Sequence, residues 1–366
     1  MKKPIYVTKP IVPNLDKLKI KLDEIWKSGI FSNQGKQHDL LEDSLKVHLK
    51  VNNLSLFNNG TSALMIALRG LNLTGETITT PFTFAATPHA LTWCGIKPVF
   101  CDIEEDSYTI DPYKIEELIT PKTSAILAVH VFGNPCNVQM IQDIANRNDL
   151  KVIYDSAHAF QTEIDGVGIG TFGDVSMFSF HPTKLFHTAE GGALACNSME
   201  LKYKLDLLKN FGIKNEEEVV LAGMNGKMNE IQAAIGLTVL GQLEENRMDR
   251  QKIKNTYVEL LKNISGITHF NTPQNIKNSL QYFAITINKK EYGISRDDLY
   301  LKLKENNIFS RKYFYPLCST YPHYAQEGSY LPIAEKTVKE ILCLPFYGEL
   351  SLEDVERICK IIQRRG

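Results

Sequence analysis

The residue most suggestive of chemistry in this chain is a lysine that follows an apolar run. Lys184 stands in FSFHPTKLFHTAEGG, residues 178–192, after the strand-like DVSMFSF and before Glu190 and two glycines. A lysine shielded from water holds its proton less tightly than a solvated one, so it can act as a nucleophile or a base. We therefore expect Lys184 on a loop between two strands, with its amine directed at a ligand.

A carboxylate and an imidazole occupy a second position where ligands commonly bind. Asp155 ends the apolar run KVIYD, and His158 follows three residues later. In open α/β sheets, the carboxyl ends of the strands form the edge that binds ligands. Considered alone, Asp155 could equally be a helix cap or turn former, and His158 a hydrogen-bonded core histidine.

An anion site is indicated where a helical run begins after the apolar LSLF. Gly60 lets the backbone approach a ligand, and free amides with the hydroxyls of Thr61 and Ser62 suit a phosphate group. An ordinary helix N-cap is the alternative for the same residues. Ser179 adds a hydroxyl close in sequence to Lys184.

Together these groups describe one cofactor chemistry. A phosphate cradle, a carboxylate at a strand end, an aromatic face such as Phe84 and a shielded lysine are what pyridoxal phosphate requires when a lysine holds it as a Schiff base.

The elements that must position these groups alternate along the chain from about residue 53. Short runs rich in β-branched and aromatic residues, such as LSLF, SAILAVHVFG and KVIYD, alternate with longer stretches of helical spacing. This alternation predicts an α/β fold in which helices cover both faces of a mostly parallel sheet. A long helical tract begins near Met228, and we place a domain boundary inside it. Residues 1–240 form an N-terminal segment with a large domain, and residues 241–366 form a smaller α/β domain.

A glycine pattern and the overall composition exclude several other classes. Residues 168–173, GIGTFG, match the dinucleotide fingerprint GxGxxG but lead into a strand instead of a helix, so we interpret them as a turn.

The net charge of -1 gives no support for nucleic-acid binding. The seven cysteines form no CxxC pair, and neither a disulfide framework nor a metal site is indicated. Because we find no signal peptide and no long apolar span, we expect a cytoplasmic protein that does not bind membranes.

Four motifs carry a resemblance to a known family. TFAAT, VIYDSAHAF, FSFHPTKLFHTAEGGAL and GMNGKMNEIQAAIGL, in this order, resemble the DegT/DnrJ/StrS family of sugar aminotransferases, and the similarity continues through SRKYFYPL and LPFYGEL. The family has the fold of type I pyridoxal-phosphate enzymes, similar to aspartate aminotransferase. The resemblance thus implies a three-layer large domain and a smaller C-terminal α/β domain.

The resemblance also implies a role for each matching residue. Lys184 and Asp155 would be catalytic, as the lysine that holds the cofactor aldehyde and as the partner of the pyridine nitrogen. The remaining cofactor contacts would be Phe84 on the ring face, His158 beside the ring, Thr61, Ser62 and Ser179 at the phosphate, and Asn225 reaching the phosphate from the other subunit of a homodimer.

The substrates implied by the resemblance are L-glutamate and a nucleotide-linked keto-deoxysugar. KLFHTAEGG, IYVTKP and FNNGTSAL are most similar to members that aminate dTDP-4-keto-6-deoxy-D-glucose at carbon 4, and cell-surface polysaccharides such as O-antigen of lipopolysaccharide are the usual destination. Relatives that remove a hydroxyl group have histidine in place of Lys184. Ala189 and the pair Gly226-Lys227 depart from the common family pattern, at positions where subgroups differ.

Candidate sugar contacts are less specific, and the acceptor and the class of protein stay open. The candidates are residues 33–35, His187, Arg311, Lys312, Tyr313 and Tyr315, although the charged pair could equally be a solvated surface. The acceptor could instead be a dTDP-3-keto, UDP-linked or GDP-linked sugar or a cyclitol. The chain could also be a non-catalytic regulatory homologue that binds the cofactor, or a nicotinamide oxidoreductase.

Overall fold

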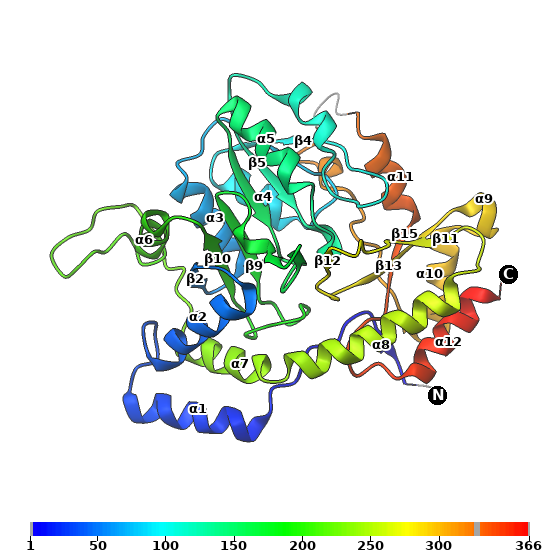
Figure 1. Ribbon diagram of the computed structural model, residues 1–366, viewed down its shortest axis with the longest axis horizontal. Coiled ribbons are helices and arrows are strands. Elements are labelled where there is room, and N and C mark those ends of the chain that lie inside the picture. The colour runs from blue at the N-terminus through cyan, green and yellow to red at the C-terminus, as the bar shows by residue number, and fades with distance from the viewer. Residues whose placement is uncertain (1–2, 326–329, 365–366) are drawn as a thin grey trace.

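The computed structural model describes residues 3–325 and 330–364, and a seven-stranded sheet lies at its centre (Figure 1). Its strands are β2 (Asn53–Phe57), β3 (Glu76–Thr79), β4 (Lys97–Phe100), β5 (Thr123–Val129), β6 (Lys151–Asp155), β9 (Val175–Ser179) and β10 (Gly192–Cys196). The strand order is β2-β10-β9-β6-β5-β3-β4, and only β10 pairs in antiparallel fashion with its neighbours among these strands. The predicted mostly parallel sheet is confirmed.

Helices cover the sheet and join it to the rest of the chain. They are α1 (Leu15–Ser28), α2 (Lys36–Leu49), α3 (Gly60–Gly70), α4 (Ala86–Trp93), α5 (Val138–Asn148), α6 (Met199–Leu208), α7 (Glu230–Leu240), α8 (Leu243–Leu261), α9 (Lys289–Tyr292), α10 (Arg296–Glu305), α11 (Pro332–Glu340) and α12 (Leu352–Gln363). Asn and Ser side chains accept backbone N–H groups at the starts of many of them, as at α3, α5 and α10, which explains where these helices begin.

Alternate residues of each strand pack on opposite faces of the sheet. In β10, Ala193 and Ala195 belong to a core with Leu41 and Leu45 of α2, whereas Leu194 packs on the other face with residues of α3. Both faces are therefore buried, which accounts for the continuous apolar runs in the sequence. This layering confirms the predicted three-layer large domain.

Smaller sheets contain the remaining strands, most of which lie in a second part of the chain. Their strands are β1 (Ile5–Tyr6), β7 (Glu163–Ile164), β8 (Val167–Gly168), β11 (Ile267–His269), β12 (Ile276–Lys277), β13 (Phe283–Ile287), β14 (Ile308–Phe309) and β15 (Ile341–Leu344). Helix α8 runs on from the end of α7 towards the sheet β11-β13-β15, and α12 packs beside it (Figure 1). The pairing of β1 with β14 also ties the first described residues to this part.

Three local predictions can be compared with the structure. The predicted helical tract after Met228 is two helices, because α7 ends before Gly241 and α8 begins at Leu243; the domain boundary at residue 240 remains a prediction. The stretch DPYKIEELI, residues 111–119, is one of the longer stretches between apolar runs for which the sequence predicts helical structure. It forms two 3-10 turns, Pro112–Lys114 and Glu116–Leu118, instead of a regular helix. The GIGTFG segment is a turn that leads into β9, as expected.

Within the described residues, no helix is long and apolar enough to cross a membrane, and no cluster of His, Cys, Asp or Glu could hold a metal ion.

Candidate active site

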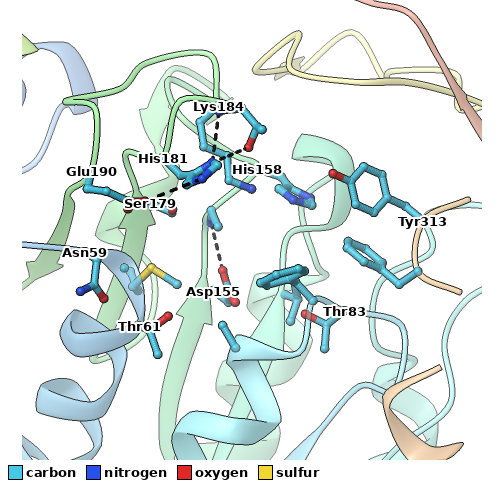
Figure 2. A pocket seen from close by; sticks show the side chains of 18 of the residues that line it. Asn59, Thr61, Thr83, Asp155, His158, Ser179, His181, Lys184, Glu190 and Tyr313 are labelled. Carbon is cyan, nitrogen blue, oxygen red and sulfur yellow. Dashed lines mark hydrogen bonds and ion pairs between the residues drawn. The ribbon is translucent and has the colours of Figure 1, made fainter. Parts of the chain in front are cut away.

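A cavity of about 570 Å³ lies at the carboxyl ends of the central strands. Figure 2 shows its side chains converging from the end of β6, the start of α3, the segment before α4, the loop between β9 and β10, and the segment around Tyr313. Six of the predicted cofactor-binding residues line it, namely Thr61, Phe84, Asp155, His158, Ser179 and Lys184. The fold therefore brings together residues that are as much as 123 positions apart in the sequence, from Thr61 to Lys184.

Lys184 lies on the loop between the antiparallel strands β9 and β10, as the sequence predicts. Its backbone amide donates to the carbonyl of His181 at 2.9 Å. Removal from water lowers the pKa of the Lys184 amine to about 8; the nearby Asp155 carboxylate opposes this change, and the Arg311 guanidinium adds to it. The amine consequently reaches its neutral, nucleophilic form much closer to physiological pH than an ordinary lysine does.

Asp155 is a buried carboxylate at the end of β6. Its Oδ2 accepts a hydrogen bond from the Thr87 hydroxyl at 2.8 Å, and its Oδ1 accepts one from the Ala157 amide at 3.0 Å. Burial raises the pKa of Asp155, while these two donors and the Lys184 amine act against that increase. Burial is the largest of these effects, so the pKa of Asp155 stays above its ordinary value, and the two hydrogen bonds and the Lys184 charge are the contacts that favour the ionised form.

The start of α3 forms one end of the cavity. Asn59 caps the helix by accepting the Ser62 amide at 2.8 Å, and Gly60 and Thr61 line the cavity. A Cβ atom on Gly192 of β10 would lie 2.8 Å from the Gly60 amide nitrogen, so only glycine allows the strand to approach the helix start this closely. Backbone amides and the positive end of the helix dipole make this end of the cavity suited to an anion.

Two predicted phosphate ligands, Ser62 and Asn225, are not among the residues that line the cavity. The Ser62 hydroxyl donates to the side chain of Asn58 and to the carbonyl of Asn59. Asn225 exposes its side chain, while its backbone oxygen accepts a hydrogen bond from Asn58 at 3.3 Å. Their roles at a phosphate stay predictions, and that of Asn225 concerns a second subunit.

Aromatic residues form the wall opposite α3. His158 is buried and stacks on Phe132 and Phe314, with ring centroids 6.0 and 5.7 Å apart. Its Nδ1 accepts the Phe132 amide at 3.3 Å, which places the proton of the neutral ring on Nε2. Burial and then the Lys184 charge hold the pKa of His158 well below its usual value, so the imidazole is neutral. Phe84 leaves 57% of its surface exposed within reach of a ligand in the cavity.

Comparison with known proteins identifies the family. The model of the DegT/DnrJ/EryC1/StrS aminotransferase family matches residues 15–363. The chain belongs to this family. It is 44% identical over 366 residues to a dTDP-4-amino-4,6-dideoxy-D-glucose transaminase of Shigella dysenteriae, and 45% identical over 365 residues to an Escherichia coli protein of the same name. These alignments cover 99% of both chains in the first case and 98% of both in the second.

The fold of this aminotransferase matches that of solved relatives. A crystal structure of DesI in the presence of its TDP-sugar product superposes with a TM-score of 0.95 at 32% identity, and the match covers 99% of this chain and 93% of that one. The predicted family, fold and enzyme class are confirmed.

The candidate sugar-binding residues of the aminotransferase separate into two groups. Arg311 and Tyr313 line the cavity, with the guanidinium 4.6 Å from the ring centroid. Lys312 instead forms an ion pair with Asp297, and Tyr315 lies against Arg296, with 5.6 Å between guanidinium and ring centroid.

The other candidates do not line the cavity. His187 is buried, and its Nε2 donates to the Ile11 carbonyl at 2.8 Å, which ties the N-terminal segment to the loop after Lys184. Residues 33–35 lead into α2, where Gly35 packs against the carboxylate of Glu230.

Sequence reasoning missed the two threonines of TFAAT, although their spacing offered a signal. Thr83 and Thr87 are four residues apart, and their hydroxyl oxygens lie 2.8 Å from each other. Because residues at this spacing lie on the same side of a helical turn, the pairing could be expected, but the contact with Asp155 could not.

Proposed function

We propose that this aminotransferase moves the amino group of L-glutamate to carbon 4 of dTDP-4-keto-6-deoxy-D-glucose, with pyridoxal 5'-phosphate as its cofactor. The observation that carries the proposal is the Lys184 amine, with its pKa lowered to about 8, in the same cavity as the buried Asp155 carboxylate. The choice of sugar rests on the two relatives named as dTDP-4-amino-4,6-dideoxy-D-glucose transaminases, which align over nearly the whole chain.

The residues present fit pyridoxal 5'-phosphate. The donor set combines an amine, a buried carboxylate, exposed ring faces and a helix start with hydroxyl groups. A Cβ atom on Gly60 would lie 3.1 Å from the Ser179 Cβ, so the side-chain-free backbone keeps this end open. Thr61, Ser179 and the first amides of α3 would hold the phosphate, Phe84 and His158 would contact the ring, and Ser62 is a further candidate. When bound, this cofactor supplies an aldehyde that condenses with amines and a ring that withdraws electrons from the attached carbon.

Lys184 and Asp155 have separate tasks in the reaction. Lys184 would hold the cofactor through its neutral amine, and the same Nζ, once free, would remove the proton from the α-carbon of L-glutamate. Asp155, when ionised, would accept a hydrogen bond from the ring nitrogen and so favour its protonated form. His158 can donate its Nε2–H but, as a neutral imidazole, adds no positive charge to the site.

Arg311 gives the cavity a positive charge for the substrates. L-glutamate brings carboxylates and the nucleotide sugar brings phosphates, so both acids gain from a guanidinium that lines the site. Stacking on Tyr313 restricts the orientations of this side chain and thus reduces the entropy lost on binding. We assign Arg311 and Tyr313, and not Lys312 or Tyr315, to substrate binding.

The test of this function uses the purified holoenzyme. L-glutamate should bleach the visible absorbance of the lysine-bound cofactor, and dTDP-4-keto-6-deoxy-D-glucose should restore it and give a 4-amino sugar by mass spectrometry and NMR. Lys184→Arg, which keeps the charge but not the reactivity, should abolish both steps. Restoration only by a 3-keto, UDP-linked or GDP-linked sugar would overturn the proposed acceptor. The absence of any borohydride-trapped cofactor on Lys184 would overturn the function itself.

We further propose a homodimer in which Asn225 completes the phosphate site of the other subunit. The exposed side chain of Asn225 is compatible with that role. The variants Lys184→Ala and Asn225→Ala should each be inactive alone. After denaturation and mixed refolding, about a quarter of the wild-type activity should return, because half of the dimers are mixed and each mixed dimer has one intact site. If Asn225 serves its own subunit, no activity returns.

A further inference from the structure

A pair of buried threonine hydroxyls lies behind the Asp155 carboxylate. Thr83 and Thr87 are 1% and 0% exposed, and the Thr87 Oγ1 lies 2.8 Å from both the Asp155 Oδ2 and the Thr83 Oγ1. The three oxygens thus form a continuous chain of buried groups beside the cavity, which Asp155 and Thr83 also line. Hydrogen bonds in such surroundings polarise one another, and an unsatisfied group there is costly.

The direction of this chain depends on the charge of Asp155. An ionised carboxylate only accepts hydrogen bonds, so Thr87 must donate its one proton to Asp155, and Thr83 must donate to Thr87. Both hydroxyls then point their protons towards the carboxylate. If Asp155 were neutral and donated its own proton to Thr87, the direction would reverse. With both hydroxyl protons directed towards Asp155, the threonine pair stabilises the ionised form of the carboxylate.

Ordinary structural roles do not account for these hydroxyls. The start of α4 has no side-chain cap, so neither threonine serves as one. A threonine inside a helix often donates to the carbonyl four residues earlier, but the Thr83 carbonyl accepts the Cys318 thiol at 3.2 Å, and the Thr87 hydroxyl meets Asp155 instead.

We infer that Thr87, supported by Thr83, is a positioning residue that keeps Asp155 ionised and fixes its orientation towards the ring nitrogen of the cofactor. The inference rests on the proposed function, since it requires a bound pyridine ring. Asp155 also accepts the Ala157 amide on its other oxygen, so the carboxylate is held from both sides. Each oxygen retains a lone pair for a further donor.

The experiment compares two cofactors in three variants. Apo-protein is titrated with pyridoxal 5'-phosphate and with its 1-deaza analogue, in which a C–H group replaces the ring nitrogen. Thr87→Val, which keeps the shape but removes the hydroxyl, should weaken binding of pyridoxal 5'-phosphate about 10- to 100-fold, the usual effect of losing a hydrogen bond to a charged group. It should leave binding of the analogue within about threefold of the wild type, because no ring nitrogen then needs an ionised partner.

Two further variants keep the inference falsifiable. Thr87→Ser retains the hydroxyl and should restore binding. Thr83→Val, which does not touch Asp155, should show the same selectivity with a smaller loss, so it provides the test if Thr87→Val does not fold.

The possible outcomes separate this inference from the proposed function. Equal weakening of both cofactors would indicate a merely structural threonine and overturn the inference, as would unchanged binding of pyridoxal 5'-phosphate. If the wild-type protein binds the cofactor but borohydride attaches none of it to Lys184, the proposed function fails independently of Thr87. If the wild type binds neither cofactor, both fail.

Discussion

The lowered pKa of Lys184 makes a quantitative prediction about the protein without cofactor. At pH 7.5, a lysine with a pKa of about 8 is about one quarter neutral, whereas one with the usual value of 10.5 is about 0.1% neutral. Lys184 should therefore react with an amine-acylating reagent roughly 200-fold faster than an ordinary lysine of equal access. Its reactivity should rise with pH and level off above about pH 8 to 9, because the protonated amine is not a nucleophile.

Competitive acetylation measured by peptide mass spectrometry provides the assay. Apo-protein is labelled briefly over a range of pH, and the exposed Lys122 is followed in the same digests as an internal reference. A midpoint for Lys184 near 10 or above would refute the reasoning, because burial would then not destabilise the charged form.

Two variants test the causes of the shift separately. Removal from water is the largest cause, Asp155 raises the pKa, and Arg311 lowers it. Asp155→Asn removes a negative charge, so the midpoint should move to lower pH. Arg311→Gln removes a positive charge, so the midpoint should move to higher pH. Shifts of both variants in the same direction would show that a general change in packing, and not local charge, controls Lys184.

Three further substitutions, one of them with a matched control, test the local structure around the site. Ala189 has a left-handed backbone with φ of 66°, which a glycine adopts without strain. Ala189→Gly should therefore raise the free energy of unfolding, measured by urea denaturation, by about 0.5 to 1 kcal/mol. The control Ala234→Gly, inside α7, should lower it. Gly192→Ala would place a Cβ atom 2.8 Å from the Gly60 amide, so it should cost about 1–3 kcal/mol of stability and weaken cofactor binding in a fluorescence titration. The buried Glu230 accepts two amides at the start of α2, both at 2.8 Å, and Glu230→Gln should cost about 1–3 kcal/mol by the same denaturation measurement.

The sequence predicted the central elements of the site because their signals are local. The apolar run that ends in Asp155 and the loop that carries Lys184 each follow a strand, and strand ends are recognisable from apolar runs. The glycine pattern at residues 168–173 was correctly interpreted from the strand that follows it. The expected cytoplasmic location has no such local signal and stays a prediction.

Side-chain direction in the second part of the chain could not be predicted in this way. Arg311, Lys312 and Tyr313 are consecutive and all polar or aromatic, so composition does not distinguish them. Backbone pairing of Arg311 with Cys343 orients the extended segment, and alternate side chains then point to opposite sides. Arg311 and Tyr313 consequently face the cavity, while Lys312 turns towards Asp297. This choice depends on a partner 32 positions away in the sequence.

The threonine pair shows how topology builds a site from distant motifs. TFAAT follows β3, and Asp155 ends β6; the two strands flank β5 in the parallel part of the sheet. Parallel strands present their carboxyl ends at one edge, so the fold alone predicts that the two motifs lie close together. It does not predict which hydroxyl meets the carboxylate, because that depends on the helical turn that stacks Thr83 and Thr87 on one side. The same short turn also leaves Phe84 facing the cavity, so a single motif both supports Asp155 and provides a ring face.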